Sequence, residues 1–323
     1  MQYIVGRVTD SDIRRAAQLI RAGRLVAFPT ETVYGLGANA LDAAAVERIF
    51  EAKGRPKTSP LIVHVASIEM ARSLALEWPA LADKLASAFW PGPLTLVIRK
   101  RDVIPPIVTA GLDTVGLRMP AHPVALDLLR EAGVPIAAPS ANRFTELSPV
   151  AAEHVRASLG DRVDLILDGG ECSVGIESTV LSVAAGAPVL LRPGIVSAAD
   201  IEALAGPVQR AGEPNAGAHQ SPGQHARHYR PRKPLYLVNA GAALPDGRGA
   251  YLWRTRPQPA SVVVQMPEGS AEFAARLYGT LHELDHRDVD WIAIERPPND
   301  LAWEAVLDRL RRAQTSASWG ENG

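Results

Sequence analysis

The sequence has little cysteine, little net charge and no long apolar run, and each shortage excludes a class of protein. A single cysteine, Cys172, among 323 residues excludes an internal disulfide and a thiolate-rich metal site. A net charge of -1 excludes a globally basic protein, so any phosphate or nucleic-acid site must be a local patch. No apolar run approaches the roughly 18 residues that a membrane helix needs. Residues 1–5 also lack the basic start of a signal peptide. We therefore expect a cytoplasmic protein with no membrane segment.

The first 205 residues combine apolar strand-like runs with helical periodicity. The 47% hydrophobic and 21% charged content is typical of globular proteins, and the length favours two domains. Periodicity and capping residues predict helices over 10–22, 42–53, 67–75, 79–89, 122–132 and 198–204, and strands over 25–28, 61–65, 94–98, 114–119, 135–138, 164–167, 178–182 and 189–192. Several strands are apolar without alternation, which indicates a mixed α/β sheet covered by helices over residues 1–205.

Residues 206–234 read as a linker that ends in a dense group of cations. Glycine and proline recur there without an apolar pattern. An ordered Ser-Pro-Gly turn at 221–223 leads into two histidines, a tyrosine and several arginines. An inert spacer is the simpler interpretation, but the turn and the charges favour a functional segment.

Residues 235–323 return to an α/β pattern. Strands are predicted over 235–238, 261–264 and 291–294, and helices over 271–284 and 301–311. This small domain contains no G-x-G-x-x-G or P-loop pattern, so we assign it no nucleotide site of its own.

The chain is organised around residues 27–39, where a strand runs into a polar segment. Pro29 ends the strand pattern because its ring removes a backbone donor. Two threonines and a glutamate follow, and then Gly35 and Gly37, which permit unusual backbone angles or the close approach of a ligand. We interpret this segment as a ligand-facing loop in which the two glycines let the backbone turn.

Cations and hydroxyls elsewhere in residues 1–205 point to an anion. Lys53 and Arg55 lie two apart on a glycine-broken loop, so both can face one phosphate, although exposed basic loops are usually only solvated. Arg118 and Arg192 end predicted strands, which is where ligands gather in α/β sheets, although salt bridges would also explain them. Ser148 before a proline predicts a helix cap.

Other common catalytic sites are poorly supported. No serine lies in a G-x-S-x-G pattern. No zinc motif joins the histidines, and His64 inside an apolar strand is by default a buried, satisfied residue.

Several of these motifs in one order resemble the threonylcarbamoyl-AMP synthase family, in its long form with a YrdC-like first domain. The residues that carry the resemblance are Phe28–Gly37, Lys53-Gly54-Arg55-Pro56, Trp90–Thr95, Gly116–Pro120, Pro139–Asn142, Glu177–Val180 and Leu191–Gly194. The resemblance implies a twisted mixed sheet with helices over residues 1–205, a linker or lid over 206–234 and a small Rossmann-like domain over 235–323.

The family's activity implies a reaction of L-threonine, bicarbonate and ATP that gives threonylcarbamoyl-adenylate and pyrophosphate. A separate tRNA threonylcarbamoyl transferase then uses the product to modify adenosine 37, so contact of this chain with tRNA is at most weak or indirect. Mg²⁺ is expected with the ATP, and no permanently bound cofactor or metal ligand is implied.

Residue by residue, the family's motifs assign three kinds of site. Threonine-binding positions are matched by Thr32, His64, Arg118, Ala138 and Ser178. ATP-binding positions are matched by Arg55, Ser59, Thr114, Ser140, Ser148, Arg192 and, in the linker, Tyr229. Lys53 and Arg55 match the cations nearest the reacting groups.

Two alternatives remain open on sequence alone. A non-catalytic RNA-binding module would use the basic face of a YrdC-like domain, although the net charge and the few aromatics argue against it. A carbamoyl-transferring relative would share the pocket, but the additional domains it needs are not visible.

Overall fold

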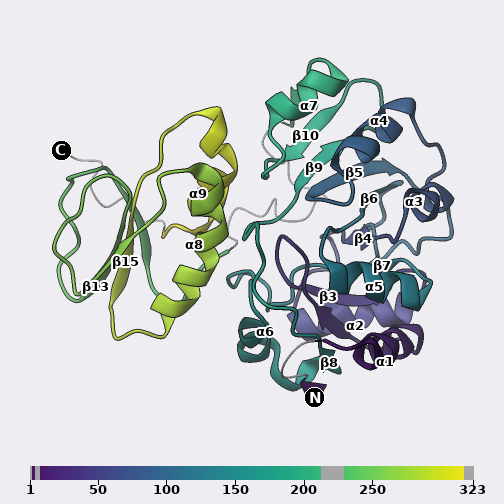
Figure 1. The fold of residues 1–323 in the computed structure, drawn as a ribbon, viewed down its shortest axis with the longest axis horizontal. Helices are drawn as coiled ribbons and strands as arrows, with labels where there is room; N and C mark the ends of the chain where they lie inside the picture. Colours follow the sequence, from purple (N-terminus) through teal and green to yellow (C-terminus); the bar gives the residue numbers. More distant parts are fainter. Residues whose placement is uncertain (1, 4–7, 212–228, 316–323) are drawn as a thin grey trace.

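The computed structural model describes residues 2–3, 8–211 and 229–315, which form two α/β units (Figure 1). The larger unit contains an eleven-stranded mixed sheet, and the smaller contains a four-stranded parallel sheet. The predicted fold class is confirmed. In the described ranges, no helix has the length and apolar character needed to cross a membrane.

The large sheet has the strand order β1-β8-β2-β3-β7-β4-β6-β5-β9-β10-β11. Its strands are β1 (Gln2–Tyr3), β2 (Val26–Phe28), β3 (Gly35–Asn39), β4 (Ile62–His64), β5 (Leu94–Arg99), β6 (Thr114–Arg118), β7 (Ile136–Ala137), β8 (Leu165–Ile166), β9 (Thr179–Ser182), β10 (Val189–Arg192) and β11 (Gln209–Arg210). The helices of this unit are α1 (Asp10–Arg21), α2 (Ala43–Lys53), α3 (Ile68–Leu74), α4 (Ala80–Phe89), α5 (Pro123–Ala132), α6 (Ala152–Leu159) and α7 (Ala198–Ala205), with a short 3-10 helix η1 (Gly160–Arg162) after α6.

Two apolar clusters cover the sheet. The buried stripe of α1, which includes Ile13 and Ile20, packs with α5 and with Phe28 of β2. The buried faces of α2 and α4 belong to the other, larger cluster. The 3.6-residue periodicity therefore predicted these helices correctly.

The segment after β2 differs from the prediction. Gly35 and Gly37 lie in strand β3, which pairs antiparallel with β2, so residues 29–34 form the connection of a hairpin. A Cβ on Gly37 would lie 2.7 Å from the Phe28 ring and 2.9 Å from Ile136. The prediction that the glycines turn the backbone is wrong, because they permit close packing inside the sheet.

Ser148 does not cap a helix. Helix α6 begins only at Ala152, and its N-cap residue makes no side-chain hydrogen bond. The Ser148 hydroxyl instead donates to Glu177 Oε1 at 2.5 Å. The predicted cap at Ser148 is therefore wrong, because a buried carboxylate competes successfully for the hydroxyl.

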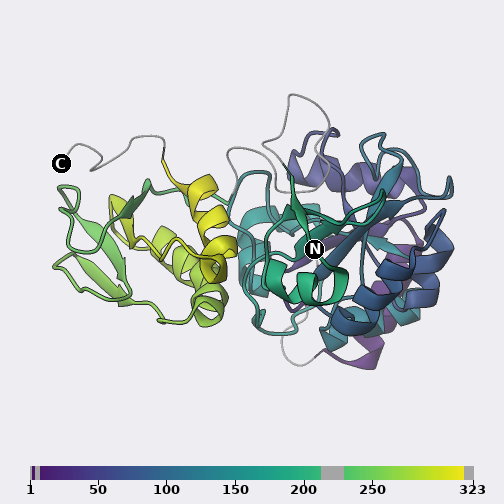
Figure 2. The same cartoon turned by 90° about the horizontal axis from the view of Figure 1, so that it is seen from above.

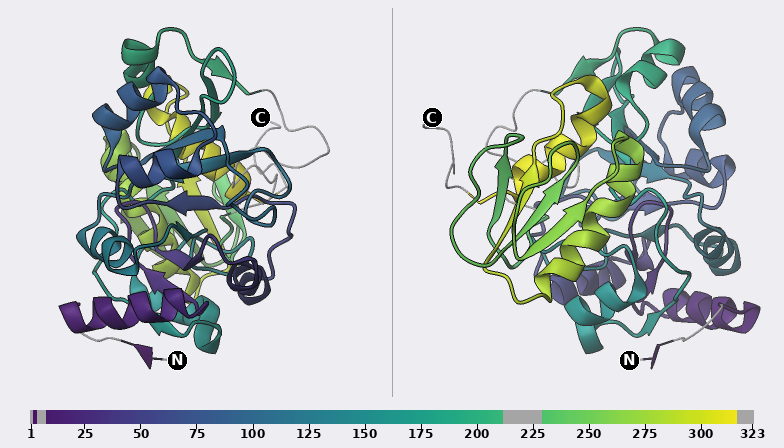
Figure 3. Two further views of the ribbon diagram at one scale, coloured as in Figure 1. Left: turned by 90° about the vertical axis from the view of Figure 1, so that its right-hand side faces the viewer. Right: turned by 60° about the vertical axis from the view of Figure 1, so that its left-hand side comes forward.

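The small unit has the strand order β12-β15-β13-β14, with every pair parallel. Its elements are β12 (Leu235–Val238), β13 (Gly249–Trp253), β14 (Val262–Gln265), α8 (Ser270–Asp285), β15 (Trp291–Glu295), a 3-10 helix η2 (Leu301–Trp303) and α9 (Glu304–Ala313). The central strand β13 was not predicted. Helices α8 and α9 lie on the side of this sheet that faces the large unit (Figures 1 and 2), and Figure 3 shows both helices across one face of the small sheet.

Candidate active site

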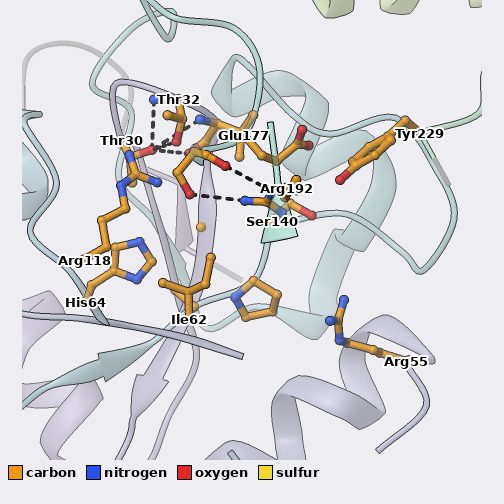
Figure 4. A pocket seen from close by; sticks show the side chains of 15 residues that line it. Thr30, Thr32, Arg55, Ile62, His64, Arg118, Ser140, Glu177, Arg192 and Tyr229 are labelled. Atoms are coloured by element: carbon orange, nitrogen blue, oxygen red, sulfur yellow. Dashed lines mark hydrogen bonds between the residues drawn. The ribbon is translucent and has the colours of Figure 1, made fainter. Parts of the chain in front are cut away.

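Strand ends and loops of the large unit surround one cavity. The empty space among its lining atoms is about 540 Å³ with the open mouth included. The lining residues come from the β2–β3 connection, the start of β3, the loop after α2, the ends of β4, β6 and β10, the loops before β9 and after β7, and the linker: Thr30, Thr32, Val33, Gly35, Arg55, Ile62, His64, Arg118, Ala138, Pro139, Ser140, Glu177, Ser178, Arg192 and Tyr229. Figure 4 shows Thr30, Thr32, His64 and Arg118 on one side, and Arg55 and Tyr229 on the other.

Hydroxyls fix the β2–β3 connection. The Thr30 hydroxyl donates to the Val33 carbonyl at 2.6 Å and accepts from the Thr32 and Val33 N–H groups at 3.2 Å. Its oxygen lies 2.8 Å from that of the buried Thr32 hydroxyl. Thr32 is therefore held rigidly at the cavity wall, and Thr30 was missed because only Thr32 matched a family position.

Arg118 and His64 lie side by side on paired strands β6 and β4. Arg118 Nη2 is 2.7 Å from Glu31 Oε1, an ion-pair distance without hydrogen-bond alignment. Both side chains are almost fully buried, so the pair brings a compensated cation to the cavity. His64 Nδ1 has no hydrogen-bond partner among the described residues. Burial, together with the Arg118 charge, lowers the pKa of His64 to about 3, so this ring is neutral near pH 7.

Ser178, directly before β9, and Arg192, at the end of the neighbouring strand β10, form a hydrogen-bonded pair. Arg192 Nε donates to the Ser178 carbonyl at 3.0 Å, and Nη2 to its hydroxyl at 3.1 Å. The Ser178 hydroxyl also lies 2.8 Å from that of Thr95 on β5. Burial lowers the pKa of Arg192 below its ordinary value, although Tyr229 and Glu177 oppose the shift. The guanidinium stays charged at pH 7, because arginine is effectively always protonated in proteins.

Arg55 and Ser140 contribute polar groups at the mouth. Arg55 Nη2 donates to the Pro60 carbonyl at 3.1 Å, and its Nε has no partner among the described residues. Burial lowers the pKa of Arg55 to about 10, which leaves the side chain cationic at pH 7. Ser140 pairs with Gly35 across the sheet, so β3 fixes its backbone. The view of Arg55 as an exposed, solvated cation is wrong.

Lys53 does not line this cavity. It is buried, and its Nζ donates to the Ser140 carbonyl at 2.6 Å and to the Asn142 carbonyl. Burial, with the charge of Arg55, places the pKa of Lys53 well below its usual range. Lys53 therefore holds the segment that carries Ser140.

Three further predicted ATP residues lie outside the cavity wall. Thr114 lines a smaller neighbouring cavity that shares Ile62 with the main one. Ser59 is buried in the loop after Arg55, and Ser148 is buried with its hydroxyl bonded to the Glu177 carboxylate. The structure thus gathers Thr32, Arg55, His64, Arg118, Ala138, Ser140, Ser178, Arg192 and Tyr229 at one cavity, and leaves Lys53, Ser59, Thr114 and Ser148 outside its lining.

Tyr229 is the linker residue on the cavity wall. Its ring is buried and stacks on Tyr278 of α8 at a centroid separation of 5.9 Å. The Arg309 guanidinium of α9 lies 5.5 Å from the Tyr229 ring centroid. Of the predicted cationic group, residues 221–228 fall outside the described residues. Arg230, Arg232 and Lys233 are described but do not line the cavity, and the backbone N–H groups of Arg232 and Lys233 donate to the Asp285 carboxylate.

Glu177 joins the two units at this wall, and sequence reasoning missed its partners. Its carboxylate accepts from Arg309 Nε at 2.8 Å and from the Tyr278 hydroxyl at 3.3 Å. One signal was available in the sequence. Arg309 lies three or four positions from Ala305, Val306 and Ala313, so it interrupts the apolar face of a helix.

A metal has no ready ligand set here. Within the described ranges, no group of three or more histidine, cysteine, aspartate or glutamate residues could hold an ion. The carboxylate on the cavity wall, Glu177, is already engaged by Arg309, Tyr278 and Ser148.

Comparisons with known proteins find relatives over nearly the whole chain. A family model described as "Telomere recombination" matches residues 18–194, and one described as "Threonylcarbamoyl-AMP synthase, C-terminal domain" matches residues 196–315. Threonylcarbamoyl-AMP synthases from Pyrococcus abyssi and Bacillus subtilis are each 42% identical; the matches cover 95% and 94% of this chain, and 95% and 93% of the relatives. The crystal structure of P. abyssi Sua5 complexed with L-threonine superposes with a TM-score of 0.89 at 41% identity, covering 96% of each chain.

Proposed function

Because this chain belongs to the threonylcarbamoyl-AMP synthase family, we propose that it is a nucleotidyltransferase that makes threonylcarbamoyl-adenylate from L-threonine, bicarbonate and ATP. The observation that carries the proposal is the cavity itself. Thr32, His64 and Arg118 stand on one side, and Arg55 and Tyr229 on the other, which suits an amino acid beside a nucleotide.

The proposed chemistry has two steps. The threonine amine attacks the carbon of bicarbonate, and loss of water leaves a carbamate. A carbamate oxygen then attacks the α-phosphorus of ATP, and the bond to the β-phosphate oxygen breaks to release pyrophosphate. Neither step needs a covalent enzyme nucleophile, so positioning and cations around the phosphates carry the catalysis.

The residues divide between the two substrates. Arg118, with Glu31 as its counter-ion, would hold the threonine carboxylate, and neutral His64 with Thr32, Ala138 and Ser178 would surround the rest of threonine. Arg55 and Arg192 remain charged at pH 7 and would face the phosphates with Ser140. Mg²⁺ would arrive on the ATP and neutralise phosphate charge. Lys53 would contribute by holding in place the segment that carries Ser140.

The non-catalytic RNA-binding alternative fits the site less well. Arg55, Arg118 and Arg192 are all buried at one cavity, whereas RNA binding needs cations spread over an accessible face. We propose that the product passes to a separate tRNA threonylcarbamoyl transferase, and that the reaction takes place in the cytoplasm, where ATP and tRNA are both present.

Pyrophosphate release tests the function directly. Purified protein is incubated with MgATP, L-threonine and labelled bicarbonate, and each substrate is omitted in turn. We expect pyrophosphate and a labelled adenylate only when all three are present. Pyrophosphate release that does not depend on threonine would contradict the proposal. Tight RNA binding at ~200 mM salt without pyrophosphate release would also contradict it.

A further inference from the structure

We propose that Arg309 of the small unit is a positioning residue for this reaction, because it fixes Glu177 and Pro193 on either side of the Ser178–Arg192 pair and supports Tyr229. The inference rests on the proposed function, since its main readout is synthase turnover. It assigns the small unit a direct part in shaping the cavity.

Arg309 makes a set of hydrogen bonds that join the two units. Its Nη2 donates to the Glu177 carbonyl at 3.3 Å, in addition to the bond between Nε and the Glu177 carboxylate at 2.8 Å. Its Nη1 donates to the Pro193 carbonyl at 3.0 Å. Glu177 directly precedes Ser178, and Pro193 directly follows Arg192. One guanidinium therefore holds together the two segments whose side chains meet at the cavity.

Arg309 also supplies the positive charge that compensates the Glu177 carboxylate. The Arg309 side chain is 0% exposed, and Asp308 accepts from its Nη1 at 2.8 Å. A buried carboxylate such as Glu177 is tolerated only when it is paired and hydrogen-bonded. Without Arg309, the Glu177 carboxylate on the cavity wall would lose its cationic partner, and its negative charge would act on the neighbouring Arg192.

Arg309 also supports the position of Tyr229. The backbone of Tyr229 has a φ of 63°, which is rare for an aromatic residue and persists only where surrounding contacts enforce it. The ring lies against the Tyr278 ring and the Arg309 guanidinium, and the next N–H, of Arg230, donates to the Thr145 carbonyl at 3.0 Å. Two residues of the small unit thus help to determine where Tyr229 lies at the cavity.

The two units lie in close contact near Glu177, where a loop of the large unit meets helix α8. Gly175, two residues before Glu177, has a φ of 77°, and a Cβ there would lie 2.5 Å from Ala275 Cα and 2.6 Å from the Ala274 carbonyl oxygen of α8. No side chain fits between this loop and the helix backbone. The loop is therefore in direct contact with α8, and a shift of the helix would move Glu177.

Four variants test the role: Arg309→Lys, Arg309→Met, the double variant Glu177→Gln/Arg309→Met, and Arg311→Met as a control on the exposed face of α9. Lysine keeps the charge but cannot reach Glu177 and Pro193 together, so we expect kcat/KM for ATP to fall about tenfold in Arg309→Lys and about a hundredfold in Arg309→Met. Arg311→Met should stay within about twofold of the wild type, because Arg311 contacts Asn299 and not the cavity.

Charge-specific rescue separates positioning from a general packing role. Because Glu177→Gln removes the uncompensated carboxylate, the double variant should exceed Arg309→Met by about fivefold or more in kcat/KM. A packing role predicts no rescue. If Arg309→Met does not fold, Arg309→Lys and the double variant decide the question.

Calorimetric binding of ATP gives a readout that does not need turnover. We expect the Kd for ATP to rise about tenfold in Arg309→Lys. An unchanged Kd and kcat/KM in Arg309→Lys, or a double variant no better than Arg309→Met, would overturn the positioning role. A wild type that binds ATP and threonine but releases no pyrophosphate would instead contradict the proposed synthase reaction, and the Kd comparison would still decide the role of Arg309.

Discussion

Lys53 and Arg55 are two apart in the sequence, yet they have different surroundings. Arg55 lies on the cavity wall, whereas the Lys53 ammonium donates to two carbonyls of the Ser140 segment. Removal of Lys53 would take a donor from one buried and one part-buried carbonyl, and an unsatisfied buried acceptor costs about 1–3 kcal/mol. Removal of Arg55 would orphan only the Pro60 carbonyl but take a cation from the phosphate side.

The two substitutions should therefore separate activity from stability. We expect Arg55→Met to lower kcat by about a hundredfold with a small loss of stability, and Lys53→Met to lower both. Thermal melting and pyrophosphate release measure the two effects. Lys57→Met is the matched control, since Lys57 is exposed and its ion pair is with Glu47 on the surface. Equal melting temperatures for Lys53→Met and wild type would show that the lysine does not hold the segment.

At the scale of elements, helices α6 and α8 meet through two stacked histidines. The ring centroids of His154 and His282 are 3.8 Å apart, and the angle between the ring planes is 12°. His282 Nε2 lies 3.1 Å from the Ser148 carbonyl oxygen. Burial, with repulsion from His282 and His286, lowers the pKa of His154 to about 3. Burial also lowers the pKa of His282, although Asp285 and Glu146 oppose this shift. Both rings are neutral in the folded protein near pH 7.

This contact predicts acid sensitivity. Histidine in the unfolded chain is protonated below about pH 6.5, whereas His154 in the folded protein stays neutral until about pH 3. Because the unfolded state then binds the additional proton, the free energy of unfolding falls as the pH decreases between these values. The slope is at most about 1.4 kcal/mol per pH unit for each proton, and less here because His154 is only partly buried. Urea unfolding at several pH values between 7.5 and 4 should give a smaller pH dependence for His154→Phe than for wild type. His64 is present in both proteins, so the difference isolates His154; identical slopes would exclude its contribution.

The same scale shows what sequence patterns can and cannot predict. The stripe of α1 and the apolar run of β2 are local signals, and both elements form where expected. Strand β3 was missed because Gly35 and Gly37 look like loop residues, although their small size is what lets Phe28 and Ile136 pack. Helix α6 begins after its apparent cap because Glu177, far along the chain, binds the Ser148 hydroxyl.

At the scale of the whole molecule, much of the cavity wall follows from motifs, but its support does not. The predicted residues Thr32, Arg118 and Ser178 are brought together by strands of one sheet. The bond between Glu177 and Arg309 spans 132 residues and two units, and no local pattern encodes it. The one signal in the sequence is that Arg309 interrupts an otherwise apolar helix face, and the sequence does not say which residue pairs with it.

Deletion of residues 212–323 tests how much the small unit contributes to the cavity wall beyond the linker. The deletion removes Tyr229 together with Tyr278 and Arg309, so the wall at Glu177 loses every contact from the small unit. If the linker alone acted as a lid, Tyr229→Ala would match the deletion in kcat/KM for ATP. We expect the deletion to be worse than Tyr229→Ala by about tenfold or more, because Glu177 also becomes unpaired. Pyrophosphate release at saturating threonine measures both variants, with circular dichroism as the check that the remaining large unit is folded. A folded truncated protein with unchanged kcat and KM would show that neither the linker nor the small unit contributes to the site.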